Sequence, residues 1–217
     1  MNTQIIKISS GIIAIDKIDE IVEVLRRDGV IAYPTETFYG LGANGFSAKA
    51  IQKVYRLKKR EASKPLSVVI SDISMLDKIV SEIPSFFRPL ISEFWPGPLT
   101  IILKASPDVP MELQGGGTIG VRLTGHTWVR SLVSRAHFPI TATSANISGE
   151  MEISSAQKAK KLYEGKVDLI VDGGVTHGIV PSTIVDMSGE EPRLVREGAI
   201  SSIQLKIFLP TLSVPQL

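Results

Sequence analysis

Residues 30–42 of the chain have the sequence VIAYPTETFYGLG, in which a short apolar run leads directly into small hydroxyl side chains and glycines. The run 30–33 predicts a buried strand that ends at Pro34. Hydroxyls and glycines at the end of a strand provide hydrogen-bond donors and let a ligand approach the backbone closely. An ordinary strand-to-helix turn has a similar composition, so both interpretations stay open for this stretch taken alone.

The chain on both sides of this stretch alternates between helical and strand-like patterns. Residues 16–28 carry apolar side chains at helical spacing, and Gly29 follows as the expected C′ residue. Ser47 is the expected N-cap of a second helix that continues through Leu57. Further strands are expected over 66–71, 99–105, 118–123, 139–143, 168–172, 182–187 and 193–195, and further helices over 74–80, 84–94, 126–136 and 154–164. This alternation predicts an α/β fold in which helices cover the faces of a sheet.

The composition excludes several classes of protein. The chain has 217 residues, 43% of them hydrophobic, a formal net charge of +2 and no cysteine. It therefore has enough apolar residues for a substantial core, and it has neither disulfides nor cysteine-based zinc sites. The three histidines lack metal-ligand spacing, no apolar run approaches the roughly 20 residues that span a bilayer, and no secretory signal pattern opens the chain. We expect a cytoplasmic protein without a membrane partner.

Three glycines match the spacing of a dinucleotide-binding fingerprint. Gly40, Gly42 and Gly45 satisfy G-x-G-x-x-G, but six residues separate the predicted strand from Gly40. The true fingerprint has its first glycine at the tight turn that ends the strand and opens straight into the helix. We therefore discount a Rossmann site.

A cluster of cations follows the second predicted helix, in the segment KKREASKPL at 58–66. Cations at a helix C-terminus are favoured by the helix dipole, which accounts for them without any ligand. The alternative is a clamp on a triphosphate, because Arg makes bidentate phosphate contacts and Lys supplies a point charge. No Walker A motif occurs in the sequence, so any ATP site here is not a P-loop.

Arg122 is the one charged residue in the apolar strand pattern TIGVRL at 118–123. A buried cation needs a partner, because an unpaired buried charge is costly. Either a substrate carboxylate or an internal Asp or Glu would serve, and the strand pattern does not choose between them.

Four further polar or rigid segments complete the set: WPGPLT at 95–100, TATSANISG at 141–149, PSTIVD at 181–186 and RLVREGAI at 193–200. Each alone is compatible with a turn that is held by side-chain hydrogen bonds. Together with PTETFYGLG, KKREASKPL and TIGVRL, in this order and spacing, they closely resemble the YrdC family. The resemblance covers residues 12–200.

The resemblance implies a fold and an activity. The fold is α/β (α+β), a twisted, mainly mixed β-sheet flanked by helices around a concave basic groove. Residues 1–200 are expected to form the catalytic domain, and 201–217 a short tail without a second domain, as in stand-alone members. Family members are threonylcarbamoyl-AMP synthases, nucleotidyltransferases that join L-threonine, bicarbonate and ATP in the first step of tRNA threonylcarbamoyladenosine modification.

The resemblance also implies site residues. L-threonine is expected at Thr37, Arg122 and Ser182, and ATP at Lys58, Arg60, Lys64, Thr118, Ser144, Asn146 and Arg196. Lys58 and Arg60 are the expected catalytic cations, both at an exposed helix end, and no side chain stands out as a general base. Mg²⁺ is expected through the ATP phosphates, without a dedicated metal site. Val69 departs from members that carry a threonine-contacting histidine there, which puts threonine selectivity in question.

Two alternatives compete with this activity. One is a paralogue that adenylates another carbamoyl substrate. The other is a module that binds double-stranded RNA or tRNA in its basic groove through backbone charge. For the synthase itself, downstream threonylcarbamoyl transferase proteins are the expected partners, and RNA in the groove is a further one.

Overall fold

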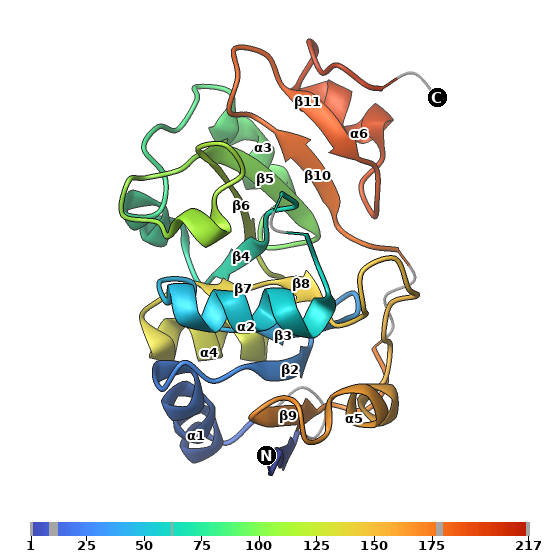
Figure 1. Ribbon diagram of the computed structural model, residues 1–217. Helices are drawn as coiled ribbons and strands as arrows, with labels where there is room; N and C mark the ends of the chain where they lie inside the picture. The colour runs from blue at the N-terminus through green and yellow to red at the C-terminus, as the bar shows by residue number, and fades with distance from the viewer. Residues whose placement is uncertain (1, 9–12, 62, 177–179, 216–217) are drawn as a thin grey trace.

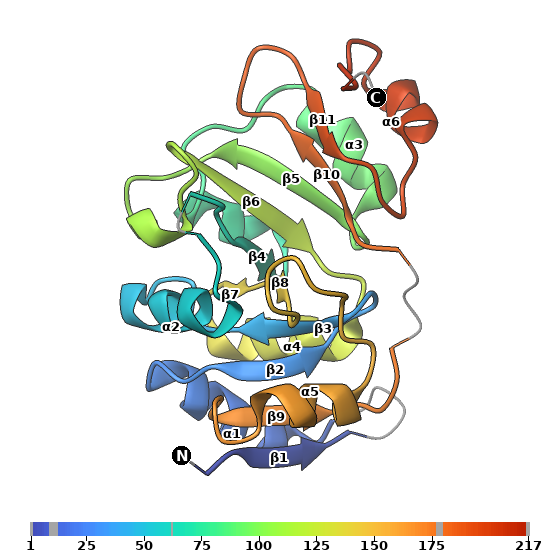
Figure 2. The ribbon, with the colours of Figure 1, turned by 45° about the vertical axis from the view of Figure 1, so that its right-hand side comes forward.

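The strands of the chain form two mixed sheets, as seen in a computed structural model that describes residues 2–8, 13–61, 63–176 and 180–215 (Figure 1). The first sheet contains, in spatial order, β1 (Gln4–Lys7), β9 (Leu169–Asp172), β2 (Ile31–Pro34), β3 (Tyr39–Gly42) and β8 (Thr143–Ser144). The second contains β11 (Arg193–Arg196), β10 (Thr183–Asp186), β5 (Leu99–Lys104), β6 (Thr118–Leu123), β4 (Ser67–Ile70) and β7 (Ile140–Thr141). Figure 2 shows β1, β9 and β2 toward the bottom of the molecule and β5, β10 and β11 toward the top.

Side-chain alternation along the strands of the first sheet divides its core into two faces. Ile31 and Tyr33 of β2 pack with helices α1 (Ile15–Arg26) and α4 (Thr127–Ala136). Ala32, between them, belongs to the larger core that includes α2 (Ala48–Lys58) and α5 (Ala156–Tyr163). Helices therefore cover both faces of this sheet, as the alternating sequence pattern predicts.

The second sheet is covered by α3 (Phe87–Phe94) and α6 (Ser202–Phe208), whose Phe94 and Phe208 rings meet edge to face with centroids 5.4 Å apart. Two short 3₁₀ helices lie in connections: η1 (Ile73–Lys78) between β4 and α3, and η2 (Met111–Leu113) between β5 and β6. Residues 201–217, expected as a tail of undetermined role, thus include a helix. Leu205, Leu209 and Leu212 of this segment are buried in the larger core.

The predicted helix boundaries hold to within a few residues, and one cap is different. Ser47 caps α2 by accepting a hydrogen bond from the Ala50 amide, as expected. At the end of α1 the left-handed residue is Asp28, with φ of 58°, and not Gly29. The Gly29 amide bonds back to the Val24 carbonyl, which closes a Schellman motif. A Cβ at position 29 would lie 2.5 Å from that carbonyl oxygen, so glycine is needed for close approach.

The main corrections concern the strands. The mixed α/β class is confirmed, but the strands divide between two sheets instead of one. The strand expected over 139–143 corresponds to two short strands, β7 and β8, which belong to different sheets. Strand β1 was not predicted. Residues 39–42, expected as part of a loop, form β3, which pairs antiparallel with β2. A Cβ on Gly42 would come within 2.8 Å of the Tyr33 ring, so this glycine serves strand packing. The structure thus agrees with discounting the dinucleotide fingerprint.

Candidate active site

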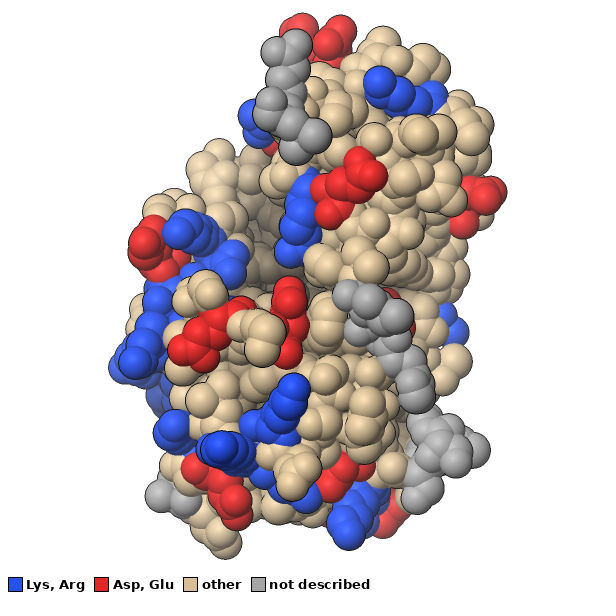
Figure 3. All heavy atoms as spheres, turned by 90° about the vertical axis from the view of Figure 1, so that its right-hand side faces the viewer, with Lys and Arg blue, Asp and Glu red and all other residues tan. Residues whose placement is uncertain are grey.

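A pocket lies between the two sheets and is lined by strands of both (Figure 3 shows a hollow between the upper and lower parts of the molecule). Six of the predicted site residues line it: Thr37, Arg60, Arg122, Ser144, Ser182 and Arg196. They come from six separate segments of the sequence that the fold brings together. The other four, Lys58, Lys64, Thr118 and Asn146, are not among the lining residues.

Arg122 forms one end of this pocket. It lies on β6 with its side chain 7% exposed, and its Nη2 is 3.8 Å from Oε2 of Glu36. Its Nε is buried without a hydrogen-bond partner among the residues that the structure describes. An internal acid is therefore present, but it is distant and leaves part of the guanidinium unsatisfied. Buried polar groups of this kind are rare, and a guanidinium with unused donors at a pocket wall is suited to an incoming anion.

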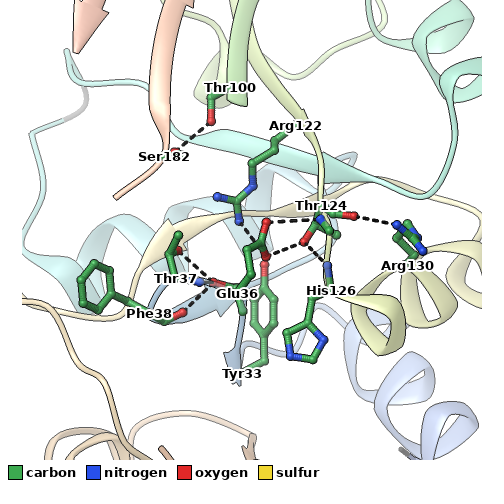
Figure 4. Close-up of polar contacts among 12 residues, drawn as sticks. Tyr33, Glu36, Thr37, Phe38, Thr100, Arg122, Thr124, His126, Arg130 and Ser182 are labelled. Carbon is green, nitrogen blue, oxygen red and sulfur yellow. Dashed lines mark hydrogen bonds and ion pairs between the residues drawn. The ribbon is translucent and has the colours of Figure 1, made fainter. Parts of the chain in front are cut away.

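Glu36 is fixed behind Arg122 by the chain that follows β6 (Figure 4). The Thr124 hydroxyl donates to Oε2 at 2.7 Å, and the Gly125 amide donates to Oε1 at 3.3 Å. Burial favours the neutral acid, but the Arg122 charge and these donated hydrogen bonds outweigh it and hold the pKa of the Glu36 carboxyl below its ordinary value. The carboxylate therefore stays ionised at neutral pH.

Hydroxyl groups lie beside Arg122 in the pocket. Thr37 belongs to the turn between β2 and β3, where its Oγ1 lies 3.1 Å from Oγ1 of Thr35. Ser182 precedes β10, and its Oγ lies 3.2 Å from Oγ1 of Thr100. These hydroxyls can donate or accept, so they can orient a small polar ligand whose carboxylate meets Arg122.

Two arginines with partly used donors line another part of the pocket. Arg196 donates to the Ser182 carbonyl from Nε at 3.1 Å and from Nη2 at 2.8 Å. Arg60 donates to the carbonyls of Lys64, at 2.7 Å, and Pro65, at 3.0 Å. Both guanidinium groups are thus held in place by backbone oxygens. Donors beyond these bonds remain for phosphate oxygens, which Arg binds in a bidentate manner.

Lys58 differs from the expectation of an exposed helix end. The residue is 1% exposed, and its ammonium donates to the carbonyls of Ser144 and, at 2.7 Å, Asn146. A further contact of 3.5 Å joins it to Asn146 Oδ1. The last turn of α2 packs against the strand and loop at 143–149. Because of this packing, the Lys58 side chain is buried and does not extend into solvent. Burial and the charge of Arg60 lower the pKa of the Lys58 ammonium to about 8.

The remaining predicted residues have local partners. The Ser144 hydroxyl bonds to Asn146 Oδ1, so Asn146 links Lys58 to the pocket wall. Lys64 is exposed and pairs with Glu61 at 3.3 Å, and the Thr118 hydroxyl donates to the Gly115 carbonyl at 2.7 Å. Val69 is fully buried in the core and is the β4 partner of Arg122 in the β4–β6 register.

Two acidic residues at the site, one lining the pocket and one behind it, were not predicted. Glu152 lines the pocket, and its charge acts on Lys58 and Arg196. It lies in the loop before α5, where a charged residue carries no signal in a single sequence. Glu36 stands inside the quoted PTET segment but was given no role, because its partners Thr124 and Gly125 lie almost ninety residues further on.

No ready-made metal site or membrane span was found in the described parts of the chain. Within those residues, no three His, Asp or Glu side chains are grouped so as to hold a metal ion. Among the described helices, none has the length and apolar character to cross a membrane.

A family model named Sua5_yciO_yrdC, with the description "Telomere recombination", matches residues 23–198. The chain belongs to the Sua5/YciO/YrdC family. The resemblance in the sequence motifs is thereby confirmed.

Relatives within this family carry informative names. The chain is 38% identical over 177 residues to the threonylcarbamoyl-AMP synthase of Pyrococcus abyssi, a match that covers 81% of this chain and 52% of that protein. It is 36% identical over 200 residues to the enzyme of the same name from Bacillus subtilis, covering 91% of this chain and 58% of that one. The chain thus spans little more than half the length of these relatives.

The fold agrees closely with a solved family structure. The crystal structure of P. abyssi Sua5 complexed with L-threonine matches with a TM-score of 0.93 and 35% identity, covering 98% of this chain and 63% of that one.

Proposed function

We propose that this chain is a threonylcarbamoyl-AMP synthase, a nucleotidyltransferase that makes L-threonylcarbamoyladenylate and pyrophosphate from L-threonine, bicarbonate and ATP. The observation that carries the proposal is the buried, partly unsatisfied guanidinium of Arg122 at a pocket that also holds Arg60 and Arg196. The names of the relatives and the threonine-bound family structure support threonine and ATP as substrates.

In this proposal Arg122 binds the threonine carboxylate. The planar guanidinium would keep its distant contact to Glu36 at Nη2 and would use its remaining donors for direct hydrogen bonds to the substrate. Thr37 and Ser182, whose hydroxyls face the same pocket, would orient the rest of the amino acid. Val69 is buried in the core, so the contact made by histidine in some family members would fall to other residues.

The phosphates of ATP would lie toward Arg60 and Arg196, with the backbone and side chains of Ser144 and Asn146 completing the nucleotide site. Lys58 would act there mainly by holding this segment, since its donors already meet three oxygen atoms. Lys64 and Thr118 are assigned to the nucleotide on family resemblance alone. Mg²⁺ would arrive bound to the triphosphate, because carboxylates and phosphates are its usual ligands and no ready-made cluster was found among the described residues.

The chemistry requires positioning more than acid–base catalysis. The free amine of threonine attacks bicarbonate, water leaves and a carbamate forms. A carbamate oxygen then attacks the α-phosphorus of ATP, and pyrophosphate leaves. Alignment of the reactants can contribute about 7–11 kcal/mol to such a reaction, and fixed cations stabilise charge on the transferring phosphate.

The direct test is pyrophosphate release by the purified chain. We expect release that requires ATP, L-threonine and bicarbonate together, with threonylcarbamoyl-adenylate identified by mass spectrometry. Release that is unchanged when threonine and bicarbonate are omitted would reject these substrates. Use of another carbamoyl compound in place of threonine and bicarbonate would identify the chain as the paralogue.

The wider role follows from the same proposal. The product is a reactive adenylate, so a downstream threonylcarbamoyl transferase acting on tRNA would consume it. Direct contact with double-stranded RNA or tRNA is a separate proposal that rests on the family resemblance. It predicts binding without ATP and a steep loss of affinity with salt.

A further inference from the structure

Glu36 joins the two sheets at the Arg122 end of the pocket. It lies in the turn between β2 and β3 of the first sheet, next to Thr37. Its carboxylate accepts hydrogen bonds from Thr124 and Gly125, which directly follow β6 of the second sheet. The turn that presents Thr37 is thus tied to the strand that presents Arg122.

Glu36 also supplies the counter-charge of Arg122. The two side chains are 22% and 7% exposed, and the distance of 3.8 Å between Oε2 and Nη2 is at the long end for an ion pair. Oε2 is held at 2.7 Å by the Thr124 hydroxyl, so the carboxylate is not positioned by the arginine. The fixed carboxylate instead orients the guanidinium from one side.

The carboxylate acts from behind the pocket. Arg122 and Thr37 are among the residues that line it, whereas Glu36 is not. Figure 4 shows the guanidinium between the Glu36 carboxylate on one side and Ser182 and Thr100 on the other. An attraction at Nη2 therefore leaves the remaining donors of Arg122 for the pocket.

We propose that Glu36 is a positioning residue for amino-acid binding: its fixed carboxylate holds the Arg122 guanidinium by Nη2 so that the remaining donors can meet the substrate carboxylate, and it holds the Thr37 turn beside Arg122. The proposal rests on the proposed function, in that Arg122 is taken to meet the substrate carboxylate. Glu36 itself does not contact the reacting atoms. The charge of Glu36 is the essential property. A glutamine of the same shape would still accept from the Gly125 amide, and its NH₂ group would donate to the Thr124 hydroxyl instead of accepting from it, but it would attract Arg122 weakly.

Glu36→Gln tests the charge with little change in shape. We expect the KM for L-threonine to rise at least tenfold while the KM for ATP stays within twofold. Glu36→Asp keeps the charge and should raise the threonine KM less than Glu36→Gln does. The matched control is Asp19→Asn, which removes an acid paired with Arg135 on the exposed surface, outside the pocket, and should leave both constants unchanged.

Three kinetic results would overturn the proposal. The first is an unchanged KM for threonine in folded Glu36→Gln. The second is an equal increase in the KM values for threonine and ATP. The third is a KM for threonine that is no higher in Glu36→Gln than in Glu36→Asp. Melting temperatures of all variants are measured alongside, since a purely structural role would lower the melting temperature without separating the two KM values.

A second readout separates this proposal from the proposed function. The ¹⁵N–¹H signal of Arg122 Nε is assigned by its absence from the spectrum of Arg122→Lys. In Glu36→Gln this signal should shift or broaden, and in Asp19→Asn it should not. If the wild-type chain shows no threonine-dependent activity, the proposed substrates are wrong, and this spectrum alone decides whether Glu36 positions Arg122. An unchanged Arg122 signal in Glu36→Gln would overturn the positioning role.

Discussion

Lys58 and Arg122 are both buried cations near one pocket, and they use their donors differently. The ammonium of Lys58 meets three oxygen atoms of Ser144 and Asn146. Arg122 has one ion pair at 3.8 Å and an Nε without a partner among the described residues. Burial is nearly the same, at 1% for the Lys58 residue and 7% for the Arg122 side chain. The comparison teaches that satisfied donors mark a structural cation and unsatisfied donors mark a binding one.

The largest effect is expected from Lys58→Met, which removes the satisfied cation. Each buried acceptor left without a donor costs about 1–3 kcal/mol. The free energy of unfolding should therefore fall several times more than it does for a substitution of an exposed residue. Urea denaturation measures it, with the exposed Arg56→Met on the same helix as control. A stability equal to that of the control would show that Lys58 is not a structural pin.

The pH dependence of this stability sharpens the same point. The pKa of Lys58, about 8 in the folded chain, lies below its ordinary value of 10.5. Between these two values the unfolded chain binds a proton that the folded chain does not, so stability rises with pH, by at most about 1.4 kcal/mol per pH unit. The stability difference between wild type and Lys58→Met should therefore widen from about pH 8 to about pH 10. A stability difference that stays constant or narrows over this pH range would mean that the carbonyls keep the proton on Lys58.

Arg60→Ala is expected to weaken ATP binding and leave the fold intact. One charge-assisted phosphate contact is worth about 1.5–3 kcal/mol, which corresponds to a loss of affinity of about tenfold to a hundredfold. Calorimetric titration with a non-hydrolysable ATP analogue measures it, again with an Arg56 variant as control. An affinity within twofold of wild type would leave Arg60 as a residue that only orders the segment at 64–65.

The smallest effect is expected at Glu152, whose carboxylate lines the pocket near Lys58 and Arg196. Its charge repels a triphosphate, so Glu152→Gln should tighten ATP binding by about twofold to fivefold, in line with about 1 kcal/mol or less for partly solvated charges. The exposed Glu164→Gln, at the end of α5, is the control. Weaker ATP binding in Glu152→Gln would instead assign this carboxylate a direct part in nucleotide binding.

The sequence predicted what depends on local patterns. The Ser47 cap, the apolar stripe of α2 and the limits of β6 follow from neighbours within a few residues, and all are confirmed. Strand β3 was missed because it is short, buried on both faces and carries two glycines, so it lacks the alternation of a half-buried strand.

The candidate site could be predicted only in part from the sequence, because its properties depend on contacts between segments that are distant in the chain. Arg122 stood out as a cation in an apolar strand, yet only the fold shows that Glu36 lies 3.8 Å away. Lys58 was expected to be exposed, and its burial depends on the segment at 144–146 that closes over it. Glu152 had no sequence signal, since its position at the pocket depends on the path of a loop.

The central claim is that Arg122 is a binding cation for the amino-acid carboxylate, and Arg122→Lys tests it most directly. Lysine keeps the charge but loses the planar fork, so the KM for L-threonine should rise at least tenfold while the KM for ATP and the melting temperature change little. The measurement is threonine- and bicarbonate-dependent pyrophosphate release together with a thermal melt of both proteins. A large fall in melting temperature with an unchanged threonine KM would contradict the claim and make Arg122 the structural partner of Glu36.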